Sequence, residues 1–151
     1  MANGDILQLV TFNLANEEFG VDITRVQEIN RMMDITKIPN APEFIKGVVN
    51  LRGKIVPVVD LRKKLGFPEK EHDKSTRIMV VEVNGMVLGF IVDSVSEVLR
   101  IPESTIEPPP SLVGGVESDY LNGVGKLDDR LLLLINLEKV IKSDQLSSEA
   151  A

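Results

Sequence analysis

The sequence predicts an all-β protein made of two small five-stranded β-barrels that share a hydrophobic interface, with only short helices. Three observations support this class. Val, Ile and Leu dominate the apolar residues, with only five Phe, one Tyr and no Trp, and this composition favours strands. Short apolar runs are paired around turn residues, as in β-hairpins. The same pattern occurs twice along the 151 residues.

The two occurrences align as an internal repeat. Placing Gly20 on Gly89 also places Glu28 on Glu97. After a proline-containing stretch the alignment resumes with a larger offset, because the second copy has extra residues in this loop, and Gly47 then falls on Gly123. Ordered matches over most of the chain indicate a duplication.

Each copy contains the same series of elements. A first hairpin is predicted at 80–93 from Asn84-Gly85, a strong two-residue turn signal, and its counterpart has a longer turn at 15–18. Next comes a short segment whose apolar spacing fits either a strand or one helical turn. It is followed by a Pro-rich loop and a second hairpin. A short helix then closes each copy.

The closing helices have recognisable ends. Asp60 and Asn136 can cap the helix N-termini with their side-chain oxygens, and Gly66 is a natural residue after a helix C-terminus. The polar segment 67–76 reads as a surface linker.

These elements divide one domain, residues 1–151, into two barrels. We assign 15–77 to the first barrel and 78–142 to the second, and the strand 6–14 can pair with either. The last residues, 143–151, are expected to be disordered. Barrels of this size bury little core alone, so a shared interface is expected.

Charge and composition exclude several functions. The net charge of −6 and the scarcity of aromatic residues argue against nucleic-acid binding. No signal peptide or membrane-spanning run is present, so a cytoplasmic location is expected. Without Cys and with a single His, His72, in the polar linker, a metal site or catalytic triad is improbable. We expect no cofactor.

Two alternatives stay open. One is a hydrolase or other enzyme that uses the carboxylate of Asp128 or Asp129, although Asp is also a good turn residue. A nucleic-acid-binding small barrel is the other alternative, and its test is a gel shift that depends on salt.

The second hairpin of the first copy, residues 47–61, carries Arg52-Gly53 where its equally long twin carries Asp128-Asp129. The turn therefore does not require Arg52. An arginine at a rigid tip offers a planar fork for carboxylates, so we favour a binding role over a merely solvated tip. The flanking Val and Ile residues are expected in the core.

Four segments carry a resemblance to the CheW-type coupling proteins of bacterial chemotaxis. They are FGVDITRVQEI (19–29), IPNAPEFIKGVVNLRGKIVPVVDLR (38–62), VLGFIVDSVSEVLRI (87–101) and YLNGVGKLDDRLLLLINLEKVI (120–141). The resemblance implies two SH3-like β-barrels on a common core. It also implies a non-enzymatic adaptor, monomeric when free, that is recruited to membrane receptor arrays without inserting into the membrane.

The resemblance further implies two partners. The cytoplasmic tip of a methyl-accepting chemoreceptor would bind in the groove between the barrels, through Val26, Glu28, Gly47, Arg52, Leu88, Gly89, Val95 and Val98. The regulatory domain of a CheA-type histidine kinase would bind through Ile35, Ile38, Pro39, Ala41, Pro42 and, in a second contact, Leu112.

Overall fold

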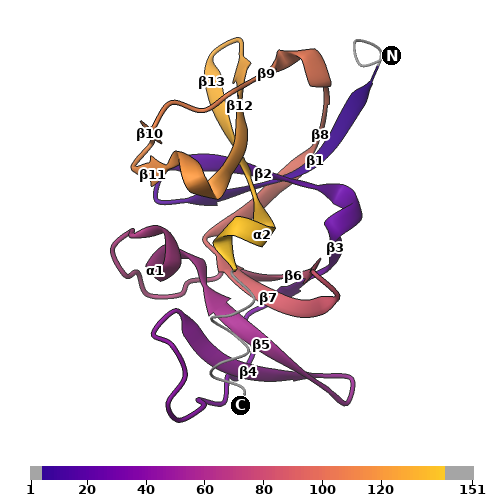
Figure 1. Cartoon of the computed structure of the whole chain (residues 1–151). Coiled ribbons are helices and arrows are strands. Elements are labelled where there is room, and N and C mark those ends of the chain that lie inside the picture. Colours follow the sequence, from indigo (N-terminus) through magenta and orange to yellow (C-terminus); the bar gives the residue numbers. More distant parts are fainter. Residues whose placement is uncertain (1–4, 142–151) are drawn as a thin grey trace.

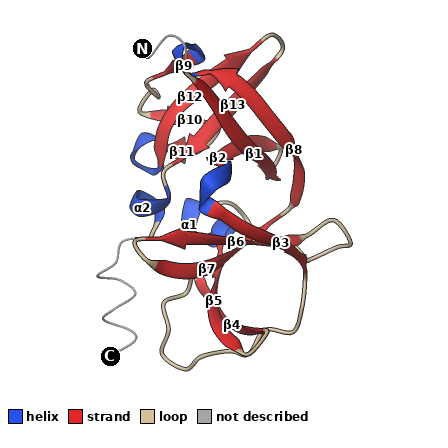
Figure 2. Ribbon diagram, turned by 90° about the vertical axis from the view of Figure 1, so that its right-hand side faces the viewer, coloured by secondary structure: helices blue, strands red, loops and turns tan. Residues whose placement is uncertain are grey.

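Strands make up most of the computed structural model, which describes residues 5–141 of the chain. They form two large sheets, one above the other (Figure 2). Two short helices, α1 (Leu61–Leu65) and α2 (Leu137–Val140), lie between the levels of the two sheets (Figure 1). The predicted all-β class with short helices is confirmed.

The first lobe is a five-stranded sheet in the order β3-β6-β7-β5-β4. Its strands are β3 (Val26–Arg31), β4 (Ile45–Leu51), β5 (Lys54–Asp60), β6 (Arg77–Val83) and β7 (Met86–Val92). Neighbouring strands are antiparallel, except that β5 and β7 run parallel. The edge strands of this lobe are therefore β3 and β4.

The second lobe is a six-stranded sheet in the order β8-β1-β2-β13-β12-β9. Its strands are β1 (Ile6–Leu14), β2 (Glu17–Asp22), β8 (Ser94–Pro102), β9 (Ile106–Glu107), β12 (Leu121–Leu127) and β13 (Arg130–Ile135). A ribbon of β10 (Leu112–Val113) and β11 (Val116–Glu117) and the 3-10 turns η2 (Ile23–Arg25), η3 (Glu103–Thr105) and η4 (Ser118–Tyr120) complete the described chain.

The two copies exchange their first hairpins. The hairpin β1–β2 of the first copy pairs with β8 and β13 of the second, while β6–β7 pairs with β3 and β5 of the first. The predicted boundaries 15–77 and 78–142 therefore do not delimit the lobes, because each sheet takes a hairpin from the other copy. The strand 6–14 lies in the second lobe, and the expected disordered segment 143–151 lies outside the described residues.

The strand registers confirm the duplication. Gly89 lies opposite Val58 in one parallel strand pair, and Gly20 lies opposite Leu134 in the other. Bulges interrupt β3 and β8 at equivalent positions. Each lobe thus repeats the arrangement of the other, including the irregular positions.

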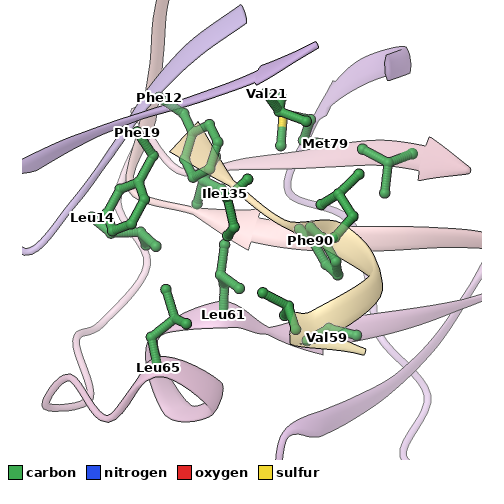
Figure 3. Packing of buried hydrophobic residues seen from close by; sticks show 14 of the residues in the cluster. Phe12, Leu14, Phe19, Val21, Val59, Leu61, Leu65, Met79, Phe90 and Ile135 are labelled. Carbon is green, nitrogen blue, oxygen red and sulfur yellow. The ribbon is translucent and has the colours of Figure 1, made fainter. Parts of the chain in front are cut away.

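The largest hydrophobic cluster lies between the lobes, as expected. Phe12 and Phe19 of the second lobe stack with ring centroids 5.5 Å apart. Met79 and Phe90 of the first lobe belong to the same cluster (Figure 3). Strand β6 is buried on both faces, because Ile78 belongs to the separate cluster inside the first lobe. Two-sided burial explains the continuous apolar runs of β6 and β7.

The helix ends follow the sequence. The Asp60 side chain accepts a hydrogen bond from Lys63 N at 3.3 Å, and Asn136 accepts one from Lys139 N at 3.0 Å. Gly66 has a φ of 87° and ends α1. Both N-caps and the terminal glycine are therefore confirmed.

One turn differs from the prediction. Instead of a longer turn at 15–18, Leu14 pairs directly with Glu17 and the turn consists of Ala15 and Asn16 alone, with φ of 50° and 70°. Asn tolerates a positive φ better than most residues, and this allows a two-residue turn without glycine.

Candidate functional site

Four apolar residues on the two edge strands β3 and β8 continue the core between the lobes toward the surface. Val26 pairs with Val81 and Val95 with Phe12, and both valines pack half-buried against the cluster between the lobes. Residues directly opposite each other in a strand pair share a face.

The other two residues lie further along the same strands. Ile29 is paired with Met79, and Val98 with Val10, so their side chains lie on the face turned to the other lobe. Ile29 is 40% exposed and Val98 is 51% exposed. We call Val26, Ile29, Val95 and Val98 the apolar seam.

Arg52 lies at the tip of the β4–β5 hairpin. Its side chain is 73% exposed and forms an ion pair with Glu28 of β3, which also accepts a hydrogen bond from Asn30 Nδ2 at 3.1 Å. These hydrogen bonds, that of Arg52 first, lower the pKa of Glu28 below its ordinary value. Glu28 therefore stays ionised and holds the arginine beside the seam strand.

The backbone of this tip corrects part of the sequence argument. Arg52 has a φ of 51° and Gly53 a φ of 85°, whereas neither Asp128 nor Asp129 has a positive φ. The two hairpins therefore do not share one turn geometry, although neither needs an arginine. Arg52 occupies a left-handed conformation that costs a residue with a Cβ atom about 1–2 kcal/mol. Backbone strain of this kind is typical of functional sites, and it favours a role of Arg52 in binding.

A small pocket lies beside the ion pair. Its volume is about 150 Å³, and its lining residues come from β3, the β4–β5 hairpin, β6 and β7. Glu28 and Arg52 border it together with Leu51 and Val80. An apolar floor with a charged rim suits a protruding side chain of a partner.

Three residues of the predicted receptor set are buried. Leu88 is 1% exposed and belongs to the core between the lobes, and Gly89 is buried in β7. A Cβ on Gly47 would lie 2.2 Å from Thr36 O, so this glycine lets the chain at Thr36 pair with β4. Leu88, Gly89 and Gly47 therefore offer no surface to a docked partner, because their positions are filled by packing.

The predicted kinase set lies on different loops. Ile38 is 43% exposed on the loop before β4, and Leu112 is 61% exposed on β10 of the other lobe. Pro39 is also exposed, Ala41 and Pro42 are half-buried, and Ile35 packs half-buried against the core of the first lobe. The structure thus brings 38–42 together as one surface and places Leu112 on a second one.

Sequence reasoning missed several exposed apolar residues, among them Ile29 and Ile55. Ile29 falls on Val98 in the alignment that places Gly20 on Gly89, so the repeat itself could have identified it. Ile55, expected in the core, is 62% exposed, because its side chain points away from the barrel interior that Val56 fills.

The two carboxylates of the hydrolase alternative lie at a hairpin turn. Asp128 and Asp129 are exposed at the turn of β12–β13. Within residues 5–141 no group of three or more His, Asp and Glu side chains could hold a metal ion. In the same range, no helix is long and apolar enough to span a bilayer.

Known proteins resemble this chain over nearly its whole length. A family model described as a CheW-like domain matches residues 8–145. The chain is 41% identical to the chemotaxis protein CheW of Klebsiella aerogenes, over 93% of this chain and 84% of that protein. It is 34% identical to the chemotaxis protein CheW of Bacillus subtilis, over 95% and 91% of the two chains.

A solved structure shows the same fold. The scaffolding protein TtCheW from Thermoanaerobacter tengcongensis superimposes with a TM-score of 0.85 at 42% identity, over 93% of this chain and 91% of that one. The shared fold of two SH3-like β-barrels, at this identity to a scaffolding protein, places the chain among scaffold proteins. The chain belongs to the CheW family and is an adaptor of chemotaxis signalling.

Proposed function

We propose that this chain couples the cytoplasmic tips of methyl-accepting chemoreceptors to the regulatory domain of the CheA histidine kinase. The main support is the exposed Arg52, held in a left-handed conformation by the turn and paired with Glu28 beside the apolar seam. The chain acts by binding both partners at once, without a chemical step. Receptor state reaches the kinase only through contacts that differ between the receptor states.

The apolar seam and Arg52 form the proposed receptor site. A receptor tip is a bundle of helices, and a helix presents apolar side chains at intervals of three and four residues. Ile29 and Val98 are exposed enough to meet such side chains, while Val26 and Val95 form a half-buried base. Arg52 is held by Glu28, which lies on the opposite face of β3 from Ile29, and its exposed guanidinium can pair with a carboxylate of the receptor bundle.

The loop 38–42 forms the proposed kinase site, with Leu112 as a second contact. Ile38 is exposed and flanked by Pro39, which restricts the loop backbone and lowers the entropy lost on binding. Because Leu112 lies on the other lobe, one chain can touch two kinase domains. We further propose that the chain is monomeric when free, resides in the cytoplasm and is recruited to receptor arrays at the membrane.

Co-sedimentation with receptor-containing membranes tests the receptor site. Arg52→Glu reverses the charge at the tip and is expected to lower the bound fraction at least tenfold, with kinase binding unchanged. Lys74→Glu, at an exposed position of the 67–76 linker, is the matched control and is expected to bind normally. Normal sedimentation of Arg52→Glu would exclude this arginine from the receptor site.

Binding to the isolated kinase regulatory domain tests the other surface. Ile38→Asp places a charge in the apolar contact and is expected to weaken kinase affinity, while co-sedimentation with receptors is retained. If the variant loses receptor binding instead, the assignment of the two surfaces is wrong. Wild-type protein that binds neither partner would overturn the proposed function itself.

A further inference from the structure

Two ion pairs connect the lobes, one at the start of each seam strand. Arg62 of α1 donates to both carboxylate oxygens of Asp93, from Nε at 2.9 Å and from Nη2 at 2.6 Å. Asp93 directly precedes β8 of the second lobe, whereas α1 follows β5 of the first. Asp93 also directly follows β7 of the first lobe, so the pair joins α1 to the residue at which the chain passes from one lobe to the other.

The second ion pair lies where the chain passes in the opposite direction, from β2 of the second lobe to β3 of the first. Arg25 directly precedes β3 of the first lobe, and its Nη2 is paired with Glu138 of α2, which follows β13 of the second lobe. Arg25 Nε also donates to Glu82 O at 3.2 Å. Both ion pairs thus join a short closing helix to the residue directly before an edge strand, where the chain passes between the lobes.

The repeat places the two pairs at the same position on the helix side and one residue apart on the strand side, with their charges reversed. Arg62 falls on Glu138 in the same part of the alignment that places Asp60 on Asn136. Arg25 falls on Ser94, the neighbour of Asp93, in the earlier part of the alignment. The helix carries the cation in one pair and the anion in the other. Both copies therefore have an ion pair at this place, although the positive and negative partners are exchanged. We take this as an indication that the ion pair itself, rather than the identity of either residue, is important.

Asp93 also forms hydrogen bonds with residues other than Arg62. Its Oδ2 accepts Ala15 N at 3.0 Å, its own N–H donates to Asn13 O at 3.0 Å, and Asn13 Nδ2 donates to Ser94 Oγ at 3.0 Å. Arg62 Nη1 also donates to Pro68 O at 2.6 Å. The first residues of β8 are therefore fixed to the β1–β2 turn, to α1 and to the linker 67–76.

We propose that Arg62–Asp93 and Arg25–Glu138 are two clamps that set the spacing of β3 and β8, and hence the shape of the apolar seam. Both seam strands are edge strands with a single neighbour in their sheet, so contacts at their starts add to the restraint that this one neighbour provides. The clamps act as positioning elements and do not touch the receptor. This proposal rests on the proposed receptor site.

The two clamps are expected to differ in strength. The side chains of Arg62 and Asp93 are 15% and 18% exposed, whereas those of Arg25 and Glu138 are 33% and 44% exposed. Exposed ion pairs contribute little, while breaking a more buried pair leaves an uncompensated charge. A change at Arg62 should therefore alter the seam more than a change at Glu138.

The spacing can be measured directly with spin labels, because the chain contains no Cys. Gln27 and Ser96 are exposed bulge residues without a cross-strand partner, at equivalent positions of β3 and β8, and Ser96 Oγ accepts a hydrogen bond from Asn13 Nδ2 at 2.8 Å. With Gln27→Cys and Ser96→Cys labelled, the wild-type background should give one narrow distance distribution by pulsed electron resonance. Arg62→Gln is expected to broaden or shift it, and Glu138→Gln to do so less.

Affinities are measured on the same clamp variants without labels. Arg62→Gln should weaken receptor binding about tenfold and change kinase binding less than twofold, because the loop 38–42 lies within one lobe. Exchanging the pair, as Arg62→Asp with Asp93→Arg, should restore part of the distance distribution and of receptor binding. Thermal unfolding of each variant establishes that it is folded.

Three outcomes would overturn the clamps. These are an unchanged distance distribution in Arg62→Gln, a changed distribution with unchanged receptor binding, and equal losses of receptor and kinase binding. Absence of receptor binding by the wild type would reject the proposed receptor site instead. The distance measurement would then still show whether the ion pairs set the spacing of β3 and β8.

Discussion

Gly89 lies so close to Ile78 that a Cβ atom on the glycine would be 2.8 Å from Ile78 Cγ2. The contact is inside the first lobe, where Ile78 is fully buried and belongs to the barrel core. At the equivalent position of the second lobe, a Cβ on Gly20 would be 3.4 Å from Leu132 and Leu9. Equivalent glycines thus have unequal room for a side chain.

Gly89→Ala should therefore destabilise the protein more than Gly20→Ala. Overpacking in a core costs about 1–3 kcal/mol, and we expect this range at Gly89 and less than about 1 kcal/mol at Gly20, where contacts are nearly ordinary. Urea unfolding followed by circular dichroism measures both variants. Equal losses would mean that Ile78 moves aside as easily as the leucines of the second lobe do.

Much of the fold could be predicted from the sequence because the signals are local. Asn84-Gly85 marks a hairpin turn, Asp60 and Asn136 mark helix starts, and the repeat is a matter of spacing. The exchange of hairpins is not local. Pairing β6–β7 within its own copy or with the other copy would bury the same residues, so the alternation of apolar residues does not distinguish the two arrangements.

The site could be predicted only in part, and for similar reasons. Arg52 and Val98 are exposed, and the repeat or the resemblance pointed to both. Leu88 lies within a continuous apolar run, and only the shared interface shows that both faces of its strand are buried. The left-handed conformation of Arg52 could not be predicted from the comparison of the two hairpins either, because hairpins of equal length can have different turn geometries.

Arg52→Asn should separate stability from binding. Asparagine tolerates the left-handed conformation, as Asn84 does with a φ of 52° in the equivalent position of another hairpin. The relief of strain offsets the loss of the exposed ion pair with Glu28, because exposed ion pairs contribute little to stability. Thermal unfolding should be unchanged or slightly higher, while receptor co-sedimentation should fall. A clear loss of stability would show that the ion pair, rather than the turn, dominates at this position.

Ile29→Ser should weaken receptor binding although sequence reasoning did not select this residue. Its side chain is 40% exposed, so we expect a stability change of no more than about 1 kcal/mol. Ile6→Ser is the matched control, because Ile6 is 48% exposed and lies on β1, outside the apolar seam. Receptor affinity several-fold lower for Ile29→Ser than for Ile6→Ser is expected. Equal affinities would remove Ile29 from the receptor site.

Acid should weaken the protein through the carboxylate of Asp93. Burial alone would raise the pKa of Asp93, but hydrogen bonds from Arg62 and from Ala15 N lower it below its ordinary value of 3.8. The unfolded chain then binds the proton more readily than the folded one near pH 4. The stability contributed by Asp93 is therefore present above its ordinary pKa and is lost as the pH falls through the lower, folded value.

Asp93→Asn removes this titration while it keeps the shape of the side chain. The free energy of unfolding in urea should fall for the wild type between about pH 5 and pH 3, and fall less steeply for the variant, because the slope reflects the difference in bound protons. Asp119→Asn, an exposed residue of η4, should retain the wild-type slope. Parallel curves for the wild type and Asp93→Asn would show that Arg62 does not favour the ionised carboxylate of Asp93, and that the first clamp is weaker than its geometry indicates.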